Sequence, residues 1–199
     1  MCLLLETIKI MDGKVQNLPY HISRMNETAK ALFHSREGFS NLAIDIPQNC
    51  RQGLYKCRII YSTLIKEIEF LPYTRKTIHK IILIEDNNIN YAFKFADRGC
   101  FTKYTDTLNA GEEIIIVKNN LITDSSFSNI ALWDGRYWIT PARPLLKGTK
   151  RQQLLNGNSL IEKPVSLADF YTYQKISLIN AMNDLGEIEI QLKNNDENI

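Results

Sequence analysis

Lys94 stands between two phenylalanines in the segment 91–98, which reads YAFKFADR. Apolar neighbours desolvate a lysine amine, and desolvation lowers its pKa so that more of the amine is neutral. A neutral amine attacks carbonyl carbons and forms a Schiff base. Most lysines are solvated surface charges, so the segment by itself makes Lys94 only a candidate. Lys103, in a more polar stretch, is the second candidate.

An acidic residue in a polar turn follows about thirty residues later. Asp124 opens the segment 124–129, DSSFSN, in which Ser126 and Asn129 supply further polar groups. The ordinary explanation is a carboxylate that hydrogen-bonds within its own turn. The functional explanation pairs the carboxylate with a pyridine nitrogen and keeps that nitrogen protonated, so that the ring withdraws electrons.

The turn at Gly148-Thr149-Lys150 has features of an anion site. It precedes a helix-like stretch, and a helix N-terminus presents backbone N–H groups to an anion. Arg24, on another expected helix, has a guanidinium that suits a phosphate. Simple turns and solvated arginines are the ordinary explanations. A lysine, an acid and a Gly-Thr turn in this order can nevertheless hold pyridoxal phosphate by its aldehyde, its ring nitrogen and its phosphate.

The same segments resemble the class-IV aminotransferases, the fold-type IV family of pyridoxal-phosphate enzymes. That family includes branched-chain and D-amino-acid aminotransferases and 4-amino-4-deoxychorismate lyase. The resemblance runs from Leu5 to about Asp184. Its motifs are LETIKIMDGK at 5–14, HISRM at 21–25, FKFADR at 93–98, EEIII at 112–116, ITDSSFSNI at 122–130, WITP at 138–141 and GTKR at 148–151.

The resemblance implies a role for each matched residue. Lys94 would form the Schiff base and transfer protons, Asp124 would pair with the pyridine nitrogen, and Arg24 would bind the phosphate. Asp124 is one methylene shorter than the family's glutamate, and Lys150 stands where a threonine is frequent. A homodimer is expected on the same ground. The remaining cofactor contacts would come from Ser126, Asn129, Gly148, Thr149 and Lys150.

The resemblance leaves two reactions open. A lyase would release pyruvate and 4-aminobenzoate from aminodeoxychorismate, whereas an aminotransferase would pass the amino group to a keto acid. Three short matches favour the lyase: KFADR at 94–98 resembles its Lys-x-x-Asn-Arg run, INAM at 179–182 resembles its Cys-Asn-Ala-Leu segment, and Leu5 replaces a tyrosine of D-amino-acid aminotransferases. A non-catalytic homologue that binds cofactor or a partner is a third possibility.

The expected substrate is a small molecule with amino and carboxylate groups. Lys9, Arg58 and Arg98 are the cations available for its carboxylates. Asn180 stands where the lyase places an asparagine beside its substrate. Arg58 can equally be an outward-facing strand charge, and Asn180 a turn residue at the end of a strand.

The elements that must position these residues alternate between strands and helices. Turn chemistry and alternation predict hairpin strands at 3–11 and 15–18 around Asp12-Gly13, and helical spacing predicts a helix at 21–33 that Gly38 ends. The mixture predicts an α/β (α+β) protein with a small lobe at 1–86 and a larger lobe at 87–199 that carries Lys94. Further strands are expected at 55–61, 64–71, 78–84, 113–117, 128–133, 137–140, 176–179 and 187–192, and helices at 92–104, 149–155 and 167–173.

The composition argues against several functions. The 24 basic and 22 acidic residues are too evenly balanced to favour nucleic acid or an anionic membrane. No stretch approaches the ~20 apolar residues of a membrane helix. The four cysteines lack a C-x-x-C pair and there are only three histidines, which argues against a metal site and favours reduced thiols in the cytoplasm.

Overall fold

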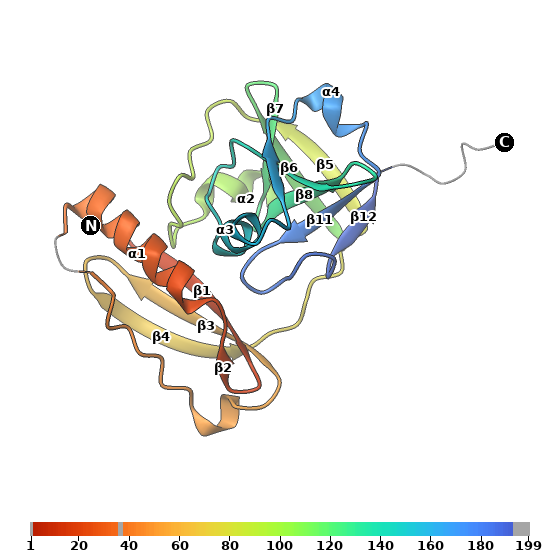
Figure 1. Cartoon of the computed structure of the whole chain (residues 1–199). Coiled ribbons are helices and arrows are strands. Elements are labelled where there is room, and N and C mark those ends of the chain that lie inside the picture. Colours follow the sequence, from red (N-terminus) through yellow and green to blue (C-terminus); the bar gives the residue numbers. More distant parts are fainter. Residues whose placement is uncertain (1, 36–37, 193–199) are drawn as a thin grey trace. The chain divides into compact units, whose positions relative to one another are not determined.

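The computed structural model describes residues 2–35 and 38–192, and the chain forms two compact units (Figure 1). The first unit comprises Met1–Arg75 with Phe93–Arg98, and the second comprises Lys76–Ala92 with Gly99–Ile199. The chain therefore leaves the first unit at Arg75 and returns to it for one short segment. Each unit has its own sheets and its own apolar core. In the described part of the chain, no helix is long and apolar enough to cross a membrane.

The first unit is a four-stranded antiparallel sheet in the order β2-β1-β3-β4, with one long helix against it (Figure 1). The predicted hairpin is confirmed, because Asp12 and Gly13 have φ of 47° and 72°, the left-handed conformations of a two-residue type I′ turn. The elements are β1 (Leu4–Met11), β2 (Lys14–Val15), helix α1 (Leu18–Phe33), a short 3-10 helix (Gln48–Cys50), β3 (Leu54–Tyr61) and β4 (Ile65–Pro72).

Helix α1 begins earlier than predicted and ends at Phe33, as predicted. A proline in its first turn begins the helix at Leu18, because proline is pre-organised for that position. The helix ends at Phe33, where His34 adopts φ 52° and donates its backbone N–H to the Ala29 carbonyl. The prediction that Gly38 ends the helix is therefore wrong. The buried side chains Met25 and Ala29 share the core of this unit with the β1 side chains Leu4, Ile8 and Ile10.

The segment Phe93–Arg98 contains no helix and pairs with the start of β1. The backbone N–H of Leu5 donates to the Lys94 carbonyl (2.9 Å), and that of Ala96 donates to the Leu3 carbonyl (2.9 Å). A β-bridge joins Leu4 and Phe95. This pairing between distant parts of the chain corrects two predictions. Helix α2 spans only Gly99–Thr105, and Lys94 belongs to the first unit, although a lobe at 87–199 was expected to carry it.

The second unit contains two sheets (Figure 1). A three-stranded sheet has the order β5-β6-β7, with β5 and β6 parallel, and a five-stranded sheet has the order β10-β9-β8-β11-β12. Side chains from both sheets meet in one core that includes Ile115, Ile130 and Leu178. The elements are β5 (Lys80–Glu85), β6 (Glu112–Lys118), β7 (Leu121–Ser125), β8 (Asn129–Trp133), β9 (Trp138–Pro141), helix α3 (Thr149–Asn156), β10 (Ile161–Lys163), helix α4 (Leu167–Phe170), β11 (Lys175–Ile179) and β12 (Glu189–Gln191).

Two strands of the second unit were not predicted. Strand β10 is three residues long, exposed throughout, and paired in parallel with β9. Strand β7 ends in Thr123, Asp124 and Ser125, which are polar yet buried. Neither strand shows the apolar alternation by which strands are found in a sequence.

Candidate active site

The predicted site residues fall into two sets, one in each unit. Lys94, Arg24, Lys9, Arg58 and Arg98 belong to the first unit. The second unit contains Asp124, Ser126, Asn129, Gly148, Thr149, Lys150 and Asn180.

Lys94 is half-buried on the segment Phe93–Arg98. Desolvation lowers the pKa of its amine to about 8, the positive charges of Arg24 and Arg98 contribute to the shift, and the charge of Glu6 opposes it. At pH 7 a pKa of about 8 leaves roughly one amine in ten neutral, several hundred times more than for an ordinary lysine. Lys103 is a poorer candidate, because its exposed ammonium binds Asp86 and its pKa is raised by hydrogen bonds to Tyr104 and Asp86.

Arg24 is held by a buried carboxylate that the sequence analysis did not single out. The guanidinium donates from Nε to Glu6 Oε1 (2.8 Å) and from Nη2 to Glu6 Oε2 (2.5 Å). His21 Nδ1 lies 2.6 Å from Glu6 Oε2. Burial would raise the pKa of Glu6, but the Arg24 charge and the His21 hydrogen bond outweigh burial and hold that pKa at about 2. Burial lowers the pKa of His21, so a neutral imidazole donates from Nδ1–H to the carboxylate.

The signal for this cluster was present in the sequence. Glu6 is an acid among the inward positions Leu4, Ile8 and Ile10 of an apolar strand, and it is completely buried. A buried charge requires partners. His21, on the buried face of α1, and Arg24 supply them.

The predicted substrate cations lie in different surroundings. Arg58 on β3 forms an ion pair with Glu69 of β4 (Nη1 to Oε2, 2.9 Å), and both side chains are about one-third exposed. Lys9 is buried, and it lies opposite Lys56 in the pairing of β1 with β3. Arg98 is exposed at the end of the segment that carries Lys94. The structure thus supports the strand-charge interpretation of Arg58.

Asp124 lies in a β-bulge at the end of β7. Ile122 pairs with Val117 and Ser125 with Ile115, so the stretch from 122 to 125 is one residue longer than the stretch opposite it in β6. Bulges of this kind change the direction in which a side chain points and are frequent next to active sites. The Asp124 carboxylate is buried and accepts hydrogen bonds from Asn129 Nδ2 (2.8 Å) and from the backbone N–H of Leu146 (2.8 Å). Burial raises its pKa to about 6, although these hydrogen bonds act in the opposite direction.

Asn129 connects the Asp124 carboxylate to the turn before α3. Its amide nitrogen also donates to the Leu146 carbonyl (2.8 Å). A Cβ atom on Gly148 would lie 1.9 Å from Asn129 Oδ1, so a side chain at position 148 would displace the Asn129 amide. Helix α3 then begins at Thr149 with no side-chain cap and no acidic residue in its first turn. Such a helix N-terminus favours an anion through its dipole and its first N–H groups.

The remaining predicted residues of the second unit have protein partners. The Lys150 ammonium forms an ion pair with Asp184 and donates to Gln153 Oε1 (2.8 Å). The backbone N–H of Ser126 donates to the buried Glu113 carboxylate (3.0 Å). Asn180 donates to Ser128 Oγ (2.9 Å) and accepts the N–H groups of Met182 and Asn183. Asn180 therefore organises a turn at the end of β11. This agrees with the alternative interpretation of Asn180 as a turn residue at the end of a strand.

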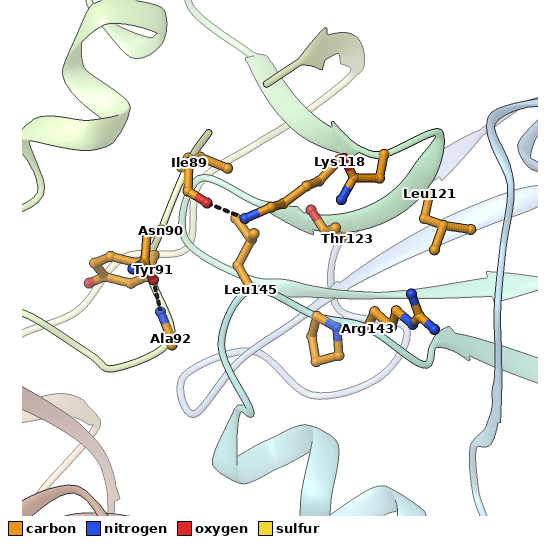
Figure 2. Close-up of a pocket in the computed structure, with 11 residues that line it drawn as sticks. Ile89, Asn90, Tyr91, Ala92, Lys118, Leu121, Thr123, Arg143 and Leu145 are labelled. Atoms are coloured by element: carbon orange, nitrogen blue, oxygen red, sulfur yellow. Dashed lines mark hydrogen bonds between the residues drawn. The ribbon is translucent and has the colours of Figure 1, made fainter. Parts of the chain in front are cut away.

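A cavity of about 290 Å³ also lies in the second unit, beside the strand that carries Asp124 (Figure 2). Lys118 crosses it and donates to the Ile89 carbonyl (2.6 Å). Its lining includes Thr123 and Leu145, which are chain neighbours of Asp124 and Leu146, but none of the predicted site residues. Within residues 2–35 and 38–192, no group of three or more His, Cys, Asp or Glu side chains could hold a metal ion.

The two sets of residues suit the parts of pyridoxal phosphate. The Asp124 carboxylate accepts two hydrogen bonds, and its oxygens have about four acceptor positions, so it can accept a further one from a protonated ring nitrogen. The uncapped start of α3, fixed by the fit of Gly148 against Asn129, suits a phosphate. Lys94 supplies an amine of lowered pKa that can attack an aldehyde.

Comparison with known proteins gives the family. Residues 92–189 match the family model for amino-transferase class IV. An uncharacterized protein of Haemophilus influenzae is 32% identical over 185 residues, which cover 92% of this chain and 98% of that protein.

Solved structures share the fold over almost the whole chain. The crystal structure of a "putative 4-amino-4-deoxychorismate lyase" from Haemophilus somnus 129PT has 28% sequence identity and a TM-score of 0.78, and the match covers 93% of this chain and 98% of that one. A hypothetical aminotransferase from Mycobacterium tuberculosis, in its PLP-bound form, has 16% identity and a TM-score of 0.69 over 94% of this chain and 80% of that one. The protein belongs to the class IV aminotransferase family and has the α/β architecture of fold-type IV enzymes.

Proposed function

We propose that this protein is a pyridoxal-phosphate-dependent enzyme that acts as a 4-amino-4-deoxychorismate lyase, releasing pyruvate and 4-aminobenzoate. The single observation that carries the proposal is the half-buried Lys94 on the segment that pairs with β1, where desolvation lowers the pKa of its amine to about 8. Such an amine can both attack an aldehyde and carry a proton near neutral pH. A solvated surface lysine, which is almost fully protonated at pH 7, would neither attack an aldehyde nor accept a proton at a useful rate.

Each residue of the two sets takes one task in this proposal. Lys94 Nζ would hold the cofactor and would move the substrate proton. Asp124 holds a proton on the ring nitrogen, and bound pyridoxal phosphate supplies an electron sink for the bond that breaks. The start of α3 would bind the phosphate, and Arg24 is the arginine that the family resemblance assigns to the same group. Glu6 and His21 orient the Arg24 guanidinium through the hydrogen bonds described above.

Two observations favour the lyase over an aminotransferase of branched-chain or D-amino-acid type. The similarity to the Haemophilus somnus protein extends over nearly the full length of both chains. The lyase-like segments 94–98 and 179–182 of the sequence contain Lys94 and Asn180. A homodimer is part of the same proposal, and light scattering of the purified protein would test it.

The first experiment tests the cofactor. The purified protein is incubated with pyridoxal phosphate, reduced with borohydride and digested, and the labelled peptide is mapped by mass spectrometry. We expect one label per chain on Lys94, and no label above background in Lys94→Ala. Label that spreads over exposed lysines such as Lys66 and Lys163 would contradict the proposal.

The second experiment tests the reaction. Aminodeoxychorismate should yield pyruvate and 4-aminobenzoate in equal amounts, and Lys94→Ala should yield neither. If an amino acid instead converts the bound cofactor to pyridoxamine phosphate, the aminotransferase is the correct reaction and the lyase proposal is wrong. Label on Lys94 without either reaction would identify a non-catalytic homologue.

A further inference from the structure

The second residue of α3, Lys150, joins its helix to the turn that follows β11. Its ammonium forms an ion pair with Asp184 at the end of that turn and also binds Gln153 within the helix. The Lys150 side chain is only 12% exposed, whereas Asp184 is 44% exposed. One partner of the pair is therefore largely shielded from water, so it is screened less than a surface ion pair.

The other end of the same turn is attached to the segment that carries Asp124. Asn180 opens the turn, donates to Ser128 Oγ (2.9 Å) and accepts the N–H groups of Met182 (2.8 Å) and Asn183 (3.0 Å). The turn 180–184 thus has two attachments, Asn180 to the 124–129 segment and Asp184 to the first turn of α3.

Asn183 cannot replace these attachments. Its side chain is completely buried, and neither of its polar atoms has a hydrogen-bond partner among residues 2–35 and 38–192. Backbone hydrogen bonds between Asn180 and Asn183 (3.1 and 3.2 Å) close the turn, and the Asp184 N–H donates to Glu187 Oε2 (2.7 Å). These bonds shape the turn itself, whereas the Lys150–Asp184 ion pair ties its last residue to α3.

The pair also affects the charge at the start of α3. A lone carboxylate near a helix N-terminus competes with an anionic ligand for the same positive potential. Lys150 neutralises Asp184, so the pair leaves the first turn of α3 favourable to an anion.

We propose that Lys150 and Asp184 are positioning residues that hold the turn 180–184 in place for substrate, and that Lys150 is not primarily a phosphate ligand. The inference rests on the proposed function, because it places substrate at this turn and the cofactor phosphate at α3. Loss of the pair should impair substrate binding more than cofactor binding.

The test compares Lys150→Met, Asp184→Asn and the double variant with the wild-type holoenzyme. Each single variant should raise KM for aminodeoxychorismate about tenfold, the order expected for one charge-assisted hydrogen bond, and change the Kd of pyridoxal phosphate less than about threefold. The double variant should resemble the singles, because both remove one interaction. Lys150→Arg should largely restore KM. Lys163→Met, an exposed lysine on β10, is the matched control.

Several outcomes would overturn the inference. An unchanged KM in Lys150→Met would show that the turn does not need the pair, and additive effects in the double variant would show that the two residues act separately. A Kd for pyridoxal phosphate that rises more than KM would make Lys150 a phosphate ligand.

Hydrogen exchange separates this inference from the proposed function. In the cofactor-free protein, the amides of Asp184 and Glu187, which hydrogen-bond at the end of the turn that the pair holds, should exchange about tenfold faster in Lys150→Met and Asp184→Asn than in wild type. Unchanged exchange would refute the positioning role whatever the catalytic result. If Lys94 takes no label in wild type while exchange accelerates as expected, the proposed function fails and the role of the pair in ordering the turn remains supported.

Discussion

The amine of Lys94 is the residue on which the proposed chemistry depends, and its pKa has identifiable causes. Desolvation is the largest, and the nearby charges of Arg24 and Arg98 act in the same direction. Glu6 is the acid that opposes them, but its carboxylate is already engaged by Arg24 and His21. Glu6 therefore mainly holds the Arg24 guanidinium in position, and it only partly offsets the lowering of the Lys94 pKa.

Replacing Lys94 by Met should stabilise the fold in a pH-dependent way. The folded-state pKa of about 8 lies below the unfolded value of about 10.4, so the unfolded chain binds more protons between these values and wild-type stability rises with pH across that window. Lys94→Met has no amine at this position, so it lacks this pH-dependent contribution to the free energy of unfolding. We expect the variant to be more stable by on the order of 2 kcal/mol at pH 7, with a difference that shrinks toward pH 10.

Urea unfolding of both proteins at pH 7, 8.5 and 10 measures the difference. The control is Lys66→Met, at an exposed position on β4, which should give no pH-dependent difference from wild type. A stability difference for Lys94→Met that stays constant with pH would contradict the assigned cause.

At the scale of elements, one charged cluster ties strand β1 to helix α1. Glu6 on the strand is completely buried, and its partners His21 and Arg24 both come from the helix. A buried ion pair contributes little to stability compared with apolar packing, but breaking one partner is costly because it leaves an uncompensated charge. The cluster therefore fixes the position of Arg24 more than it strengthens the fold.

Glu6→Gln should destabilise the first unit by about 3 kcal/mol at pH 7, because the largely buried Arg24 guanidinium loses its counter-charge. The folded pKa of Glu6, about 2, lies below the ordinary 4.5, so its stabilising effect is present above pH 4.5 and is lost as pH falls toward 2. The difference between wild type and Glu6→Gln should therefore shrink between pH 5 and pH 2.5 in urea titrations. Glu67→Gln, on the exposed part of β4, is the control. An undiminished difference at pH 2.5 would exclude Glu6 ionisation as the cause.

The elements that the sequence predicted well are those set by local patterns. The β1–β2 hairpin follows from Asp12-Gly13 between apolar alternations, and α1 follows from an apolar face with helical spacing. The pairing of Phe93–Arg98 with β1 was missed because its hydrogen bonds join residues about ninety positions apart. Strand β7 was missed because its buried end consists of the polar residues Thr123, Asp124 and Ser125.

The same distinction applies to the site. Lys94, Asp124 and Gly148 were singled out from their types and order. In the structure, desolvation shifts the pKa of Lys94 and of Asp124, and Gly148 packs closely against Asn129. Glu6 could be recognised as an acid on an apolar strand, but its pairing with Arg24, 18 positions away, could not be predicted. The partners of Lys150 and Asn180 were not predictable either, because Asp184 and Ser128 are 34 and 52 positions away in sequence. Local patterns thus identify candidate residues, whereas what each side chain binds depends on tertiary contacts.

At the scale of the whole molecule, the first unit is not a continuous stretch of chain. Residues 1–75 supply its sheet and helix, but Phe93–Arg98 completes it after the chain has passed through part of the second unit. The completing segment pairs with Leu3 and Leu5, and Phe93 and Phe95 pack against the apolar core of the unit. The residue that carries the proposed chemistry therefore lies on a strand-like segment that also stabilises the first unit.

A fragment of residues 1–75 should consequently be less stable than one that also contains the completing segment. We compare it with a fusion of 1–75 to 93–98 through a flexible Gly-Ser linker of 17 residues, the length of the stretch 76–92 that it replaces. The fusion should be more stable by at least about 2 kcal/mol in urea unfolding followed by far-UV circular dichroism, because two half-buried phenylalanines and two backbone hydrogen bonds are restored. A second fusion with Phe93 and Phe95 both changed to Ser should lose most of that gain. If the fragment 1–75 and the first fusion are equally stable, residues 1–75 fold independently. The segment Phe93–Arg98 would then position Lys94 without stabilising the first unit.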